Sequence, residues 1–454
     1  MRDAPNDGSR RPTLDETADV AVEFPDLTPR GTRQQWTRSA LASFDGVFAR
    51  SIETRGDRAG RSDRDVPAFV VGTGRGVVRA FDSTGTALWR VDVGGMAVAL
   101  EPTLADGEPV VLVGTRGETA VVTLLDAVTG DPRWTHDVET DLGSATRETF
   151  FYYPMTVALA SDPGRSSGDR LYAAARRYER DGDDRRFESR VYAFEPDGTV
   201  AWVHESDASP VAIDRRDDRL AVAYNRCGGS HQCGLVVLDA ASGELRLTWD
   251  PGTEGERRVG DVALDADGAV VASHGDYRGY ALDEAGRERW RVDLGRPVER
   301  GGDTVYTYPN HVALADGRVL FLTGNTFPVE GRDTDGRHPD EHTLAAVDPA
   351  TGDREATAPI DGWLGGLSAG AGGDDRVALA VGQRFRDRDP TAHGLRLVDP
   401  TTGAVDRHRT DGVAVDVASF GDRVAVLEEP IGYHDEPVDR GTHRLLIRSS
   451  TATR

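Results

Sequence analysis

The chain has 454 residues and a formal net charge of −23 at pH 7, and all 54 of its basic residues are arginine. This length allows two or three ordinary domains or a single body built from repeats. Nucleic acid is excluded as a natural partner, because phosphate backbones bind net basic surfaces. No apolar run reaches the roughly 18 residues of a membrane-spanning helix, so no span is expected.

The absence of lysine and the excess of Asp and Glu resemble the proteins of salt-loving archaea. In such proteins, high salt screens the repulsion among surface carboxylates. GC-rich codon usage would favour Arg over Lys, but it would not explain the excess of acids. Residues 1–20 are polar and lack the apolar segment of a secretory signal, which predicts a disordered tail on a cytoplasmic protein. Export is expected only if the true start lies upstream.

Short β-patterned runs follow one another along the rest of the chain. They are apolar or β-branched, are bounded by Gly, Asp and Ser, and show no helical period. Pairs of runs that read as hairpins are Ala68–Thr73 with Val77–Phe81, Val110–Gly114 with Ala120–Leu125, Leu220–Tyr224 with Leu235–Leu238, and Ala269–Ser273 with Arg278–Leu282.

After each hairpin comes the same phrase, an acidic residue, a turn glycine and then a tryptophan. The five complete copies are FDSTGTALW (Phe81–Trp89), LDAVTGDPRW (Leu125–Trp134), FEPDGTVAW (Phe194–Trp202), LDAASGELRLTW (Leu238–Trp249) and LDEAGRERW (Leu282–Trp290). Two further copies, Val347–Gly352 and Val398–Gly403, keep the turn but lose the tryptophan. Successive acids such as Asp82 and Asp126 lie 44 residues apart, and the longer gaps are one period plus an insertion.

Four antiparallel strands in each period of about 40–50 residues predict an all-β fold, a single β-propeller. Seven internal turns and one blade shared by both termini predict eight blades, with seven as the alternative. We expect one domain over residues 21–454, closed by a strand at Arg33–Arg38 that joins the C-terminal blade. Such closure removes two exposed sheet edges.

The phrase [LF]-[DE]-x2–3-G-x3–5-W after an apolar hairpin resembles the quinoprotein-like repeat of pyrroloquinoline-quinone (PQQ) dehydrogenases, and the eight-blade count is similar to the outer-membrane assembly propeller. The resemblance covers residues 33–450 and implies that the tryptophans pack between neighbouring blades. The residues it assigns to inter-blade docking are Trp36, Trp89, Trp134, Trp202, Trp249 and Trp290. Blades 6 and 7 carry Ala356 and Arg407 near that place, so their docking must differ.

The resemblance does not extend to the cofactor. The family's enzymes hold the quinone over a pair of adjacent cysteines, whereas this chain has only Cys227 and Cys233, with five residues between them. No calcium-binding set can be matched, so we expect no cofactor and no metal. The two cysteines frame a hairpin tip that also contains His231, and a disulfide, free thiols and a metal site all stay open.

Two matched segments break the repeat, and they carry the information about function. Glu148–Pro154 (ETFFYYP) and Asp303–Pro309 (DTVYTYP) each lead into an innermost strand, three blades apart. The contact candidates near them are Glu148, Tyr152, Tyr153, Tyr306, Tyr308, Asn310 and His311, with Trp363 entering blade 7. Two interpretations stay open: Tyr-Pro only shapes the start of a strand, or it marks a recognition surface, since tyrosine is over-used in recognition.

The long insertions Arg176–Arg190, Thr326–His342, Arg384–His393 and Glu429–Thr442 read as loops on that same face. Long loops on a rigid scaffold are where binding usually occurs. We therefore expect a monomeric, non-catalytic binding or scaffolding propeller that contacts a protein partner or small ligand through this face. The alternative is an enzyme, a hydrolase or lyase with its site at the channel mouth. A PQQ-dependent dehydrogenase is the least favoured interpretation.

Overall fold

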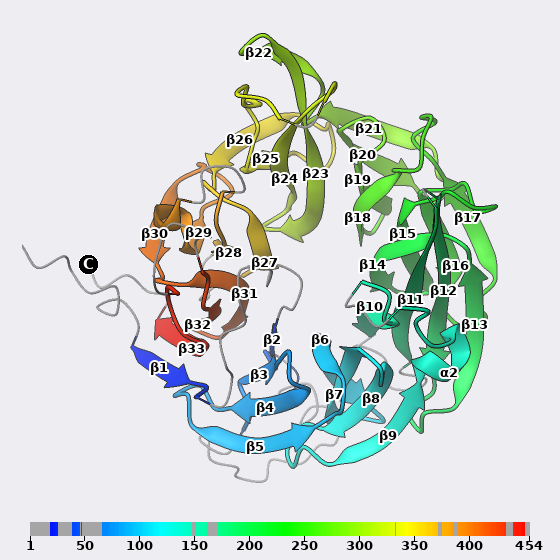
Figure 1. The fold of residues 1–454 in the computed structure, drawn as a ribbon, viewed down its shortest axis with the longest axis vertical. Helices are drawn as coiled ribbons and strands as arrows, with labels where there is room; N and C mark the ends of the chain where they lie inside the picture. The colour runs from blue at the N-terminus through cyan, green and yellow to red at the C-terminus, as the bar shows by residue number, and fades with distance from the viewer. Residues whose placement is uncertain are drawn as a thin grey trace, which may run out of the picture.

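The computed structural model describes residues 19–25, 39–45, 47, 66–147, 151–161, 170–182, 184–331, 333–370, 375–384, 389–432 and 439–449. Their strands form four-stranded antiparallel sheets arranged as a ring about a central axis (Figure 1). One of the seven hydrogen-bonded sheets contains two such units, joined by a single pairing of Arg116 with Met155. The described residues thus hold eight four-stranded units, called blades 1 to 8 in chain order. The predicted all-β propeller is confirmed.

Within each blade the strands run outward from the axis in chain order, except that blade 8 takes its outer strand from the N-terminal part of the chain. The strands of blades 1 to 4 are β2 (Ala40–Ser43), β3 (Phe69–Gly72), β4 (Val77–Phe81) and β5 (Ala87–Asp92); β6 (Met96–Ala105), β7 (Glu108–Arg116), β8 (Val121–Asp126) and β9 (Pro132–Asp137); β10 (Met155–Ser161), β11 (Leu171–Asp181), β12 (Asp184–Phe194) and β13 (Val200–Ser206); and β14 (Ser209–Arg216), β15 (Arg219–Arg226), β16 (Leu235–Asp239) and β17 (Leu245–Trp249).

The strands of blades 5 to 8 are β18 (Val259–Leu264), β19 (Gly268–Ser273), β20 (Arg278–Asp283) and β21 (Glu288–Asp293); β23 (Asp303–Ala315), β24 (Arg318–Pro328), β25 (Thr343–Val347) and β26 (Arg354–Pro359); β27 (Leu364–Ser368), β28 (Val377–Val381), β29 (Gly394–Val398) and β30 (Val405–Arg409); and β31 (Val413–Phe420), β32 (Arg423–Glu429), β33 (Arg444–Ser449) and β1 (Val20–Glu23). A short strand, β22 (Val298–Arg300), pairs with the start of β23. Helix α2 (Val138–Leu142) precedes blade 3, and a 3-10 turn, Pro390–Ala392, lies in blade 7. No helix in the described ranges is long and apolar enough to cross a membrane.

The ring closes through β1, which pairs antiparallel with β33 from Val20↔Ile447 to Glu23↔Arg444. Half-buried and exposed residues alternate along β1, which suits this outer position, where one face packs and the other meets water. The side chains of Val20 and Val22 pack against Gly85 of blade 1. The outer position that the sequence predicted for Arg33–Arg38 is therefore occupied by β1. Residues 33–38, Trp36 and the tail residues 1–18 lie outside the described residues.

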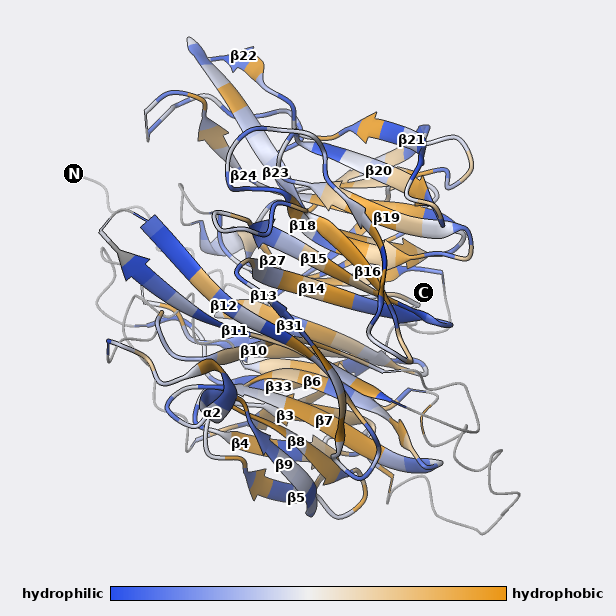
Figure 2. Cartoon of the chain, turned by 90° about the vertical axis from the view of Figure 1, so that its right-hand side faces the viewer, coloured by the Kyte–Doolittle hydropathy of each residue, from blue (hydrophilic) through white to orange (hydrophobic). Residues whose placement is uncertain are grey.

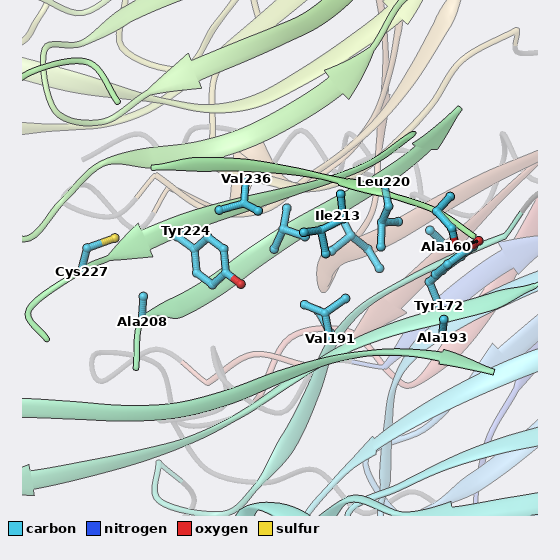
Figure 3. Close-up of a cluster of buried hydrophobic side chains, with 14 residues drawn as sticks. Ala160, Tyr172, Val191, Ala193, Ala208, Ile213, Leu220, Tyr224, Cys227 and Val236 are labelled. Carbon is cyan, nitrogen blue, oxygen red and sulfur yellow. Dashed lines mark hydrogen bonds between the residues drawn. The ribbon is translucent and has the colours of Figure 1, made fainter. Parts of the chain in front are cut away.

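Each of the eight junctions between neighbouring blades holds its own apolar cluster. Figure 3 shows the cluster between blades 3 and 4, where Tyr172 and Val191 of blade 3 meet Ile213 and Leu220 of blade 4. The second and third strands are largely buried where they lie within the ring, because they are covered on both faces, whereas the outer part of β12 is exposed. The core is thus a ring of eight interfaces, and it includes the junction of blade 8 with blade 1.

Four tryptophans dock between blades in the same way. The indole N–H donates to the carbonyl of the residue that follows the turn acid of the next blade: Trp89 to Ala127 at 2.8 Å, Trp134 to Pro196 at 3.0 Å, Trp202 to Ala240 at 3.1 Å and Trp290 to Pro349 at 2.8 Å. The indole ring lies on the turn glycine, and a Cβ added there would stand 2.6–2.9 Å from it at Gly130, Gly198, Gly243 and Gly352. Those glycines also have φ between +74° and +90°, which favours glycine.

Blades 4 and 6 depart from this arrangement. In blade 4, Leu247 and not Trp249 occupies the strand position that the docking tryptophans occupy in other blades. Leu247 pairs with Val237 as Trp290 pairs with Ala281 in blade 5. Trp249 lies two residues further along and packs on Tyr280 of blade 5, with ring centroids 4.9 Å apart, so it contacts the neighbouring blade away from the turn glycine. The blade 4 phrase has two extra residues between its glycine and its tryptophan, which moves the indole off the turn. In blade 6, Ala356 holds the register, and the backbone at Thr357 lies against Gly403.

Candidate functional site

One face of the ring, called the upper face here, carries the loops between second and third strands and the loops leading into each inner strand. Two long extensions project from it to the same side of the molecule: the β11–β12 hairpin in blade 3, and in blade 6 the start of β23, which pairs with β22 and with the end of β24 (Figure 2). The β11–β12 hairpin is paired without interruption from Leu171↔Phe194 to Asp181↔Asp184. The expected loop at Arg176–Arg190 is therefore wrong: its residues continue the two strands, because alternate side chains pack on one another across them.

An aromatic cluster lies where blade 5 meets the β23–β24 hairpin. Tyr306 and Tyr308 are two residues apart on β23, so they share one face of the strand, with ring centroids 5.2 Å apart. Tyr277, in the loop between β19 and β20, packs on both at 4.6 and 5.6 Å. Phe327 on β24 packs on Tyr306 and Tyr308 at 6.0 and 5.6 Å, and it keeps 36% of its surface exposed. This blade 5–6 cluster is a rigid, half-exposed apolar surface with hydroxyl groups on it.

The charges around this cluster are set by burial. The guanidinium of Arg257 lies 4.7 Å from the centre of the Tyr308 ring, within cation–π range. Burial raises the pKa of Tyr277 to about 12 and raises that of Tyr306 further. Burial lowers the pKa of His274, whose ring packs 4.7 Å from Tyr308, to about 3. The hydroxyl groups of Tyr277 and Tyr306 and the His274 ring are therefore uncharged at neutral pH.

A second cluster lies on the outer part of the β11–β12 hairpin in blade 3. Tyr152 stacks on Tyr178 at 5.3 Å, and Tyr178 packs on Phe187 across the hairpin at 5.3 Å. Arg147 covers the Tyr152 ring at 5.1 Å, and Arg176 lies 5.6 Å from Phe187. The two matched Tyr-Pro segments thus each support an extended hairpin with an aromatic cluster and a stacked arginine, three blades apart in the ring (Figure 1).

Arginines also gather beside the upper end of the central channel. Arg116, Arg176 and Arg226 hold equivalent places in blades 2, 3 and 4, each opposite the first residue of an inner strand. Burial lowers the pKa of Arg116 to about 9 and those of Arg176 and Arg226 to about 10, and repulsion from a neighbouring arginine adds to each shift. Like charges held together in a chain of net charge −23 make this part of the face attractive to carboxylates.

The remaining contact candidates are distributed around the ring. Tyr153 donates its hydroxyl to Glu118 of blade 2 at 3.1 Å. Trp363 packs against Gly382 of its own blade and exchanges backbone hydrogen bonds with that hairpin. Glu148 lies outside the described residues. The candidates therefore do not form one compact constellation at the channel mouth.

Asn310 and His311 belong to the channel wall, below the aromatic cluster on β23. The Asn310 amide lies over Gly324 of β24. His311 Nδ1 is 3.8 Å from the buried carboxylate of Asp261. That carboxylate accepts the backbone N–H of Val312 in the next blade at 3.0 Å, and Asp214 and Asp416 accept Leu264 and Leu41 in the same way. Because three blades share this bond, we read these acids as structural links between inner strands.

Asp261 makes the stability of the ring depend on pH. Burial raises the pKa of this carboxyl from 3.8 to about 7, although the backbone N–H groups of Val312 and Val262 oppose the rise. The folded protein holds this proton more tightly than the unfolded chain. The contribution of protonated Asp261 to the free energy of unfolding is therefore fully present below pH 3.8. It is lost as pH rises toward 7, and the free energy of unfolding falls by at most about 1.4 kcal/mol per pH unit.

The measurement compares urea unfolding of the native protein and Asp261→Asn between pH 4.5 and 8 in molar KCl. Asparagine offers one acceptor oxygen instead of two, so the variant is expected to be less stable at low pH by about 1–3 kcal/mol. The difference should shrink as pH rises, because only the native protein loses stability through this group. The other carboxylates contribute equally to the pH dependence of both proteins, so their effects cancel in the comparison. A difference that stays constant or widens would contradict the assignment.

Cys227 and Cys233 are free thiols at the hairpin tip of blade 4. Cys227 is buried beside Tyr224 at one end of the cluster in Figure 3, and its Sγ lies 3.4 Å from the carbonyl oxygen of Cys233. Burial raises the pKa of the Cys227 thiol to about 12, so it is protonated and unreactive at neutral pH. His231 packs on Tyr224 at 4.3 Å and contacts the Cys233 carbonyl. This geometry is that of a packed hairpin tip.

The residues do not fit a quinone cofactor. The two cysteines are separated along the chain and lie at the end of a hairpin, so they offer no adjacent pair under a planar ring. Among the described residues, no three His, Cys, Asp or Glu side chains come together as a metal site.

Several residues of the two clusters were not singled out from the sequence: Tyr277, Phe327, Arg257, His274, Tyr178 and Phe187. A signal existed for one pair, since a tight turn at residues 181–184 places Tyr178 opposite Phe187. No such signal existed for Tyr277, which has φ of +65° in a loop of another blade.

Comparison with solved structures places the fold among known propellers. BamB from Moraxella catarrhalis is 14% identical, with a TM-score of 0.50 over 86% of this chain and 95% of that chain. Quinohemoprotein alcohol dehydrogenase from Comamonas testosteroni is 12% identical, with a TM-score of 0.54 over 94% of this chain and 79% of that chain. The computationally designed Ika8 protein is 12% identical, with a TM-score of 0.52 over 86% of this chain and 94% of that chain. At these identities the likeness shows the fold alone.

No curated protein matches the chain by sequence. A family model does match it, over residues 74–262 and 187–410, which together span most of the ring. The matched part includes the docking tryptophans Trp89 to Trp290 and both long hairpins. The chain belongs to the family described as outer membrane protein assembly factor BamB.

Proposed function

We propose that this protein is a non-catalytic scaffold that binds a protein partner through its upper face. The observation that carries the proposal is the pair of extensions on one face, each of which carries an aromatic cluster. Aromatic side chains and arginine are enriched at the centres of protein interfaces, because they bury a large area at low entropic cost. Assembly factor is also the role in the family's name.

The blade 5–6 cluster is the best placed contact surface. Phe327 is 36% exposed and the neighbouring Val329 is 53% exposed, so two large apolar side chains meet solvent at the end of one strand. Arg257 adds a positive charge beside Tyr308. We therefore expect the partner to present a segment with apolar side chains and at least one carboxylate.

The test uses the double variant Phe327→Asp/Val329→Asp, immobilised in molar KCl so that salt screens the net charge of −23. The amount of a partner protein that the double variant retains should be at least about tenfold lower than the amount that the native protein retains, since two buried contacts become unpaired charges. The matched control is Leu245→Asp, which alters a 59% exposed leucine on the outer strand of blade 4 and should retain the partner.

A purified candidate partner is then titrated against the three proteins to measure affinity directly. Equal binding by the double variant, or partner loss in Leu245→Asp as well, would count against the proposed surface.

A further inference from the structure

The junction of blades 4 and 5 lacks the indole that fills the four junctions described above. Leu247 holds the register of the docking tryptophan there, and Trp249 is displaced onto Tyr280. The turn of blade 5, which faces this junction, has the same geometry as the turns at the other four junctions. Gly286 has φ of +75°, in line with the glycines that lie under the four indoles. The Glu284 carbonyl follows the turn acid Asp283, as the four acceptor carbonyls follow theirs.

Leu247 covers that glycine, but it is smaller than an indole and fills the junction less completely. A Cβ added to Gly286 would stand 3.3 Å from the nearest Leu247 atom, compared with 2.6–2.9 Å from the indoles at the other junctions. Ala269 leaves further space in the junction, because it pairs with Leu282 at the position where the larger Val111 pairs with Leu125 in blade 2.

A cavity of about 210 Å³ lies at this place. Its walls include the apolar side chains of Val237, Leu247, Leu264 and Leu282, and Glu284 is at its edge. These are the counterparts of residues that surround Trp89, where Leu104, Leu125 and Ala127 pack against the indole. An apolar cavity of about 150 Å³ is already large enough to bind benzene, so this one has room for a bicyclic ring.

Charged side chains mark the mouth of the cavity. Arg219 is buried and donates to the carbonyls of Asp265 and Gly268, which holds blades 4 and 5 together beside the opening. Arg246 is held by Asp218 and Asp239. Because these groups are engaged with the protein, recognition must come from the apolar walls and the Glu284 carbonyl.

We propose that this cavity is a binding site for a planar aromatic heterocycle with a ring N–H, of the size of indole. The ring lies beside Leu247, against Leu264, Ala269 and Leu282, and its N–H donates to the Glu284 carbonyl. The four tryptophans of the same chain show that the equivalent apolar walls and carbonyl accept an indole at other junctions.

The test is calorimetric titration with indole in molar KCl. The native protein should bind indole at one saturable site, and N-methylindole should bind about 2–10-fold more weakly because it cannot donate to Glu284. Leu247→Trp should abolish indole binding and raise the melting temperature, since the chain then supplies the ring itself. The matched control Leu245→Trp adds an indole to the same strand at an exposed position and should bind indole as the native protein does.

A second variant keeps the test decisive if Leu247→Trp does not fold. Ala269→Val introduces the side chain found at this place in blade 2 and should weaken indole binding by narrowing the cavity. The proposal is overturned if the native protein binds no indole, or if a folded Leu247→Trp or Ala269→Val binds it as strongly as the native protein. Equal affinity for indole and N-methylindole would overturn the assignment of the Glu284 carbonyl.

Discussion

Replacing Trp290 with alanine is expected to lower the free energy of unfolding by about 3–5 kcal/mol. The side chain is only 6% exposed, and it packs on Phe321 of the next blade with ring centroids 6.5 Å apart. Its removal leaves a cavity between blades 5 and 6 and deprives the Pro349 carbonyl of its donor. Urea unfolding in molar KCl, followed by circular dichroism, measures the loss.

Trp363→Ala is the matched control for this change. Trp363 is half-buried and packs on Gly382 of its own blade, whereas Trp290 packs on the turn glycine of the next blade. Its removal should cost clearly less than the removal of Trp290. Similar losses for the two variants would mean that the docking tryptophans are not what holds neighbouring blades together.

Replacing Glu428 with alanine is expected to destabilise the closing blade by about 3–5 kcal/mol at pH 7.5. Glu428 is fully buried in blade 8, where it accepts Arg444 Nε at 2.9 Å and the backbone N–H of Gly412 at 2.7 Å. Burial raises the pKa of this carboxyl, which shows how costly its charge is without these partners. Truncation leaves the Arg444 guanidinium buried with its main counter-charge removed. The unfolding midpoint in urea measures the effect.

The double variant Glu428→Ala/Arg444→Ala separates loss of the pair from loss of a partner. Because it removes both charges, it should be more stable than the sum of the two single changes implies, by about 1–3 kcal/mol. Glu428→Gln keeps the volume and one acceptor, and it should fall between the native protein and the alanine variant. Strict additivity of the two alanine changes would refute the coupling.

The repeat phrase was sufficient to predict the fold, and the reason is local. An aspartate such as Asp82 accepts the backbone N–H groups of Thr84 and Thr86, which closes the turn within a few residues. The following glycine supplies the positive φ, and the tryptophan four residues later falls on the face toward the next blade. All of this is encoded within about ten residues, so a period visible in the sequence implies a period in space.

The candidate site was predictable only in part. The Tyr-Pro segments stood out because they repeat, and the structure places Tyr152, Tyr306 and Tyr308 in two aromatic clusters. Their partners come from other strands or from another blade, as Tyr277 does for Tyr308. Such contacts depend on how far each hairpin extends and on how neighbouring blades are rotated relative to one another. Neither quantity can be inferred from a short segment of sequence.

The sequence by itself determined the class of fold, the turn positions and the face that carries the irregular loops, because turns and strand periodicity are properties of neighbouring residues. Only the tertiary structure decided which strand closes the ring, where β1 is held by Val20 and Val22 against Gly85. It alone decided that Leu247 and not Trp249 meets the turn of blade 5, since that depends on register across two strands. Both outcomes are settled by packing between segments that lie far apart in the chain or in different blades, where the burial of apolar area selects among locally equivalent choices.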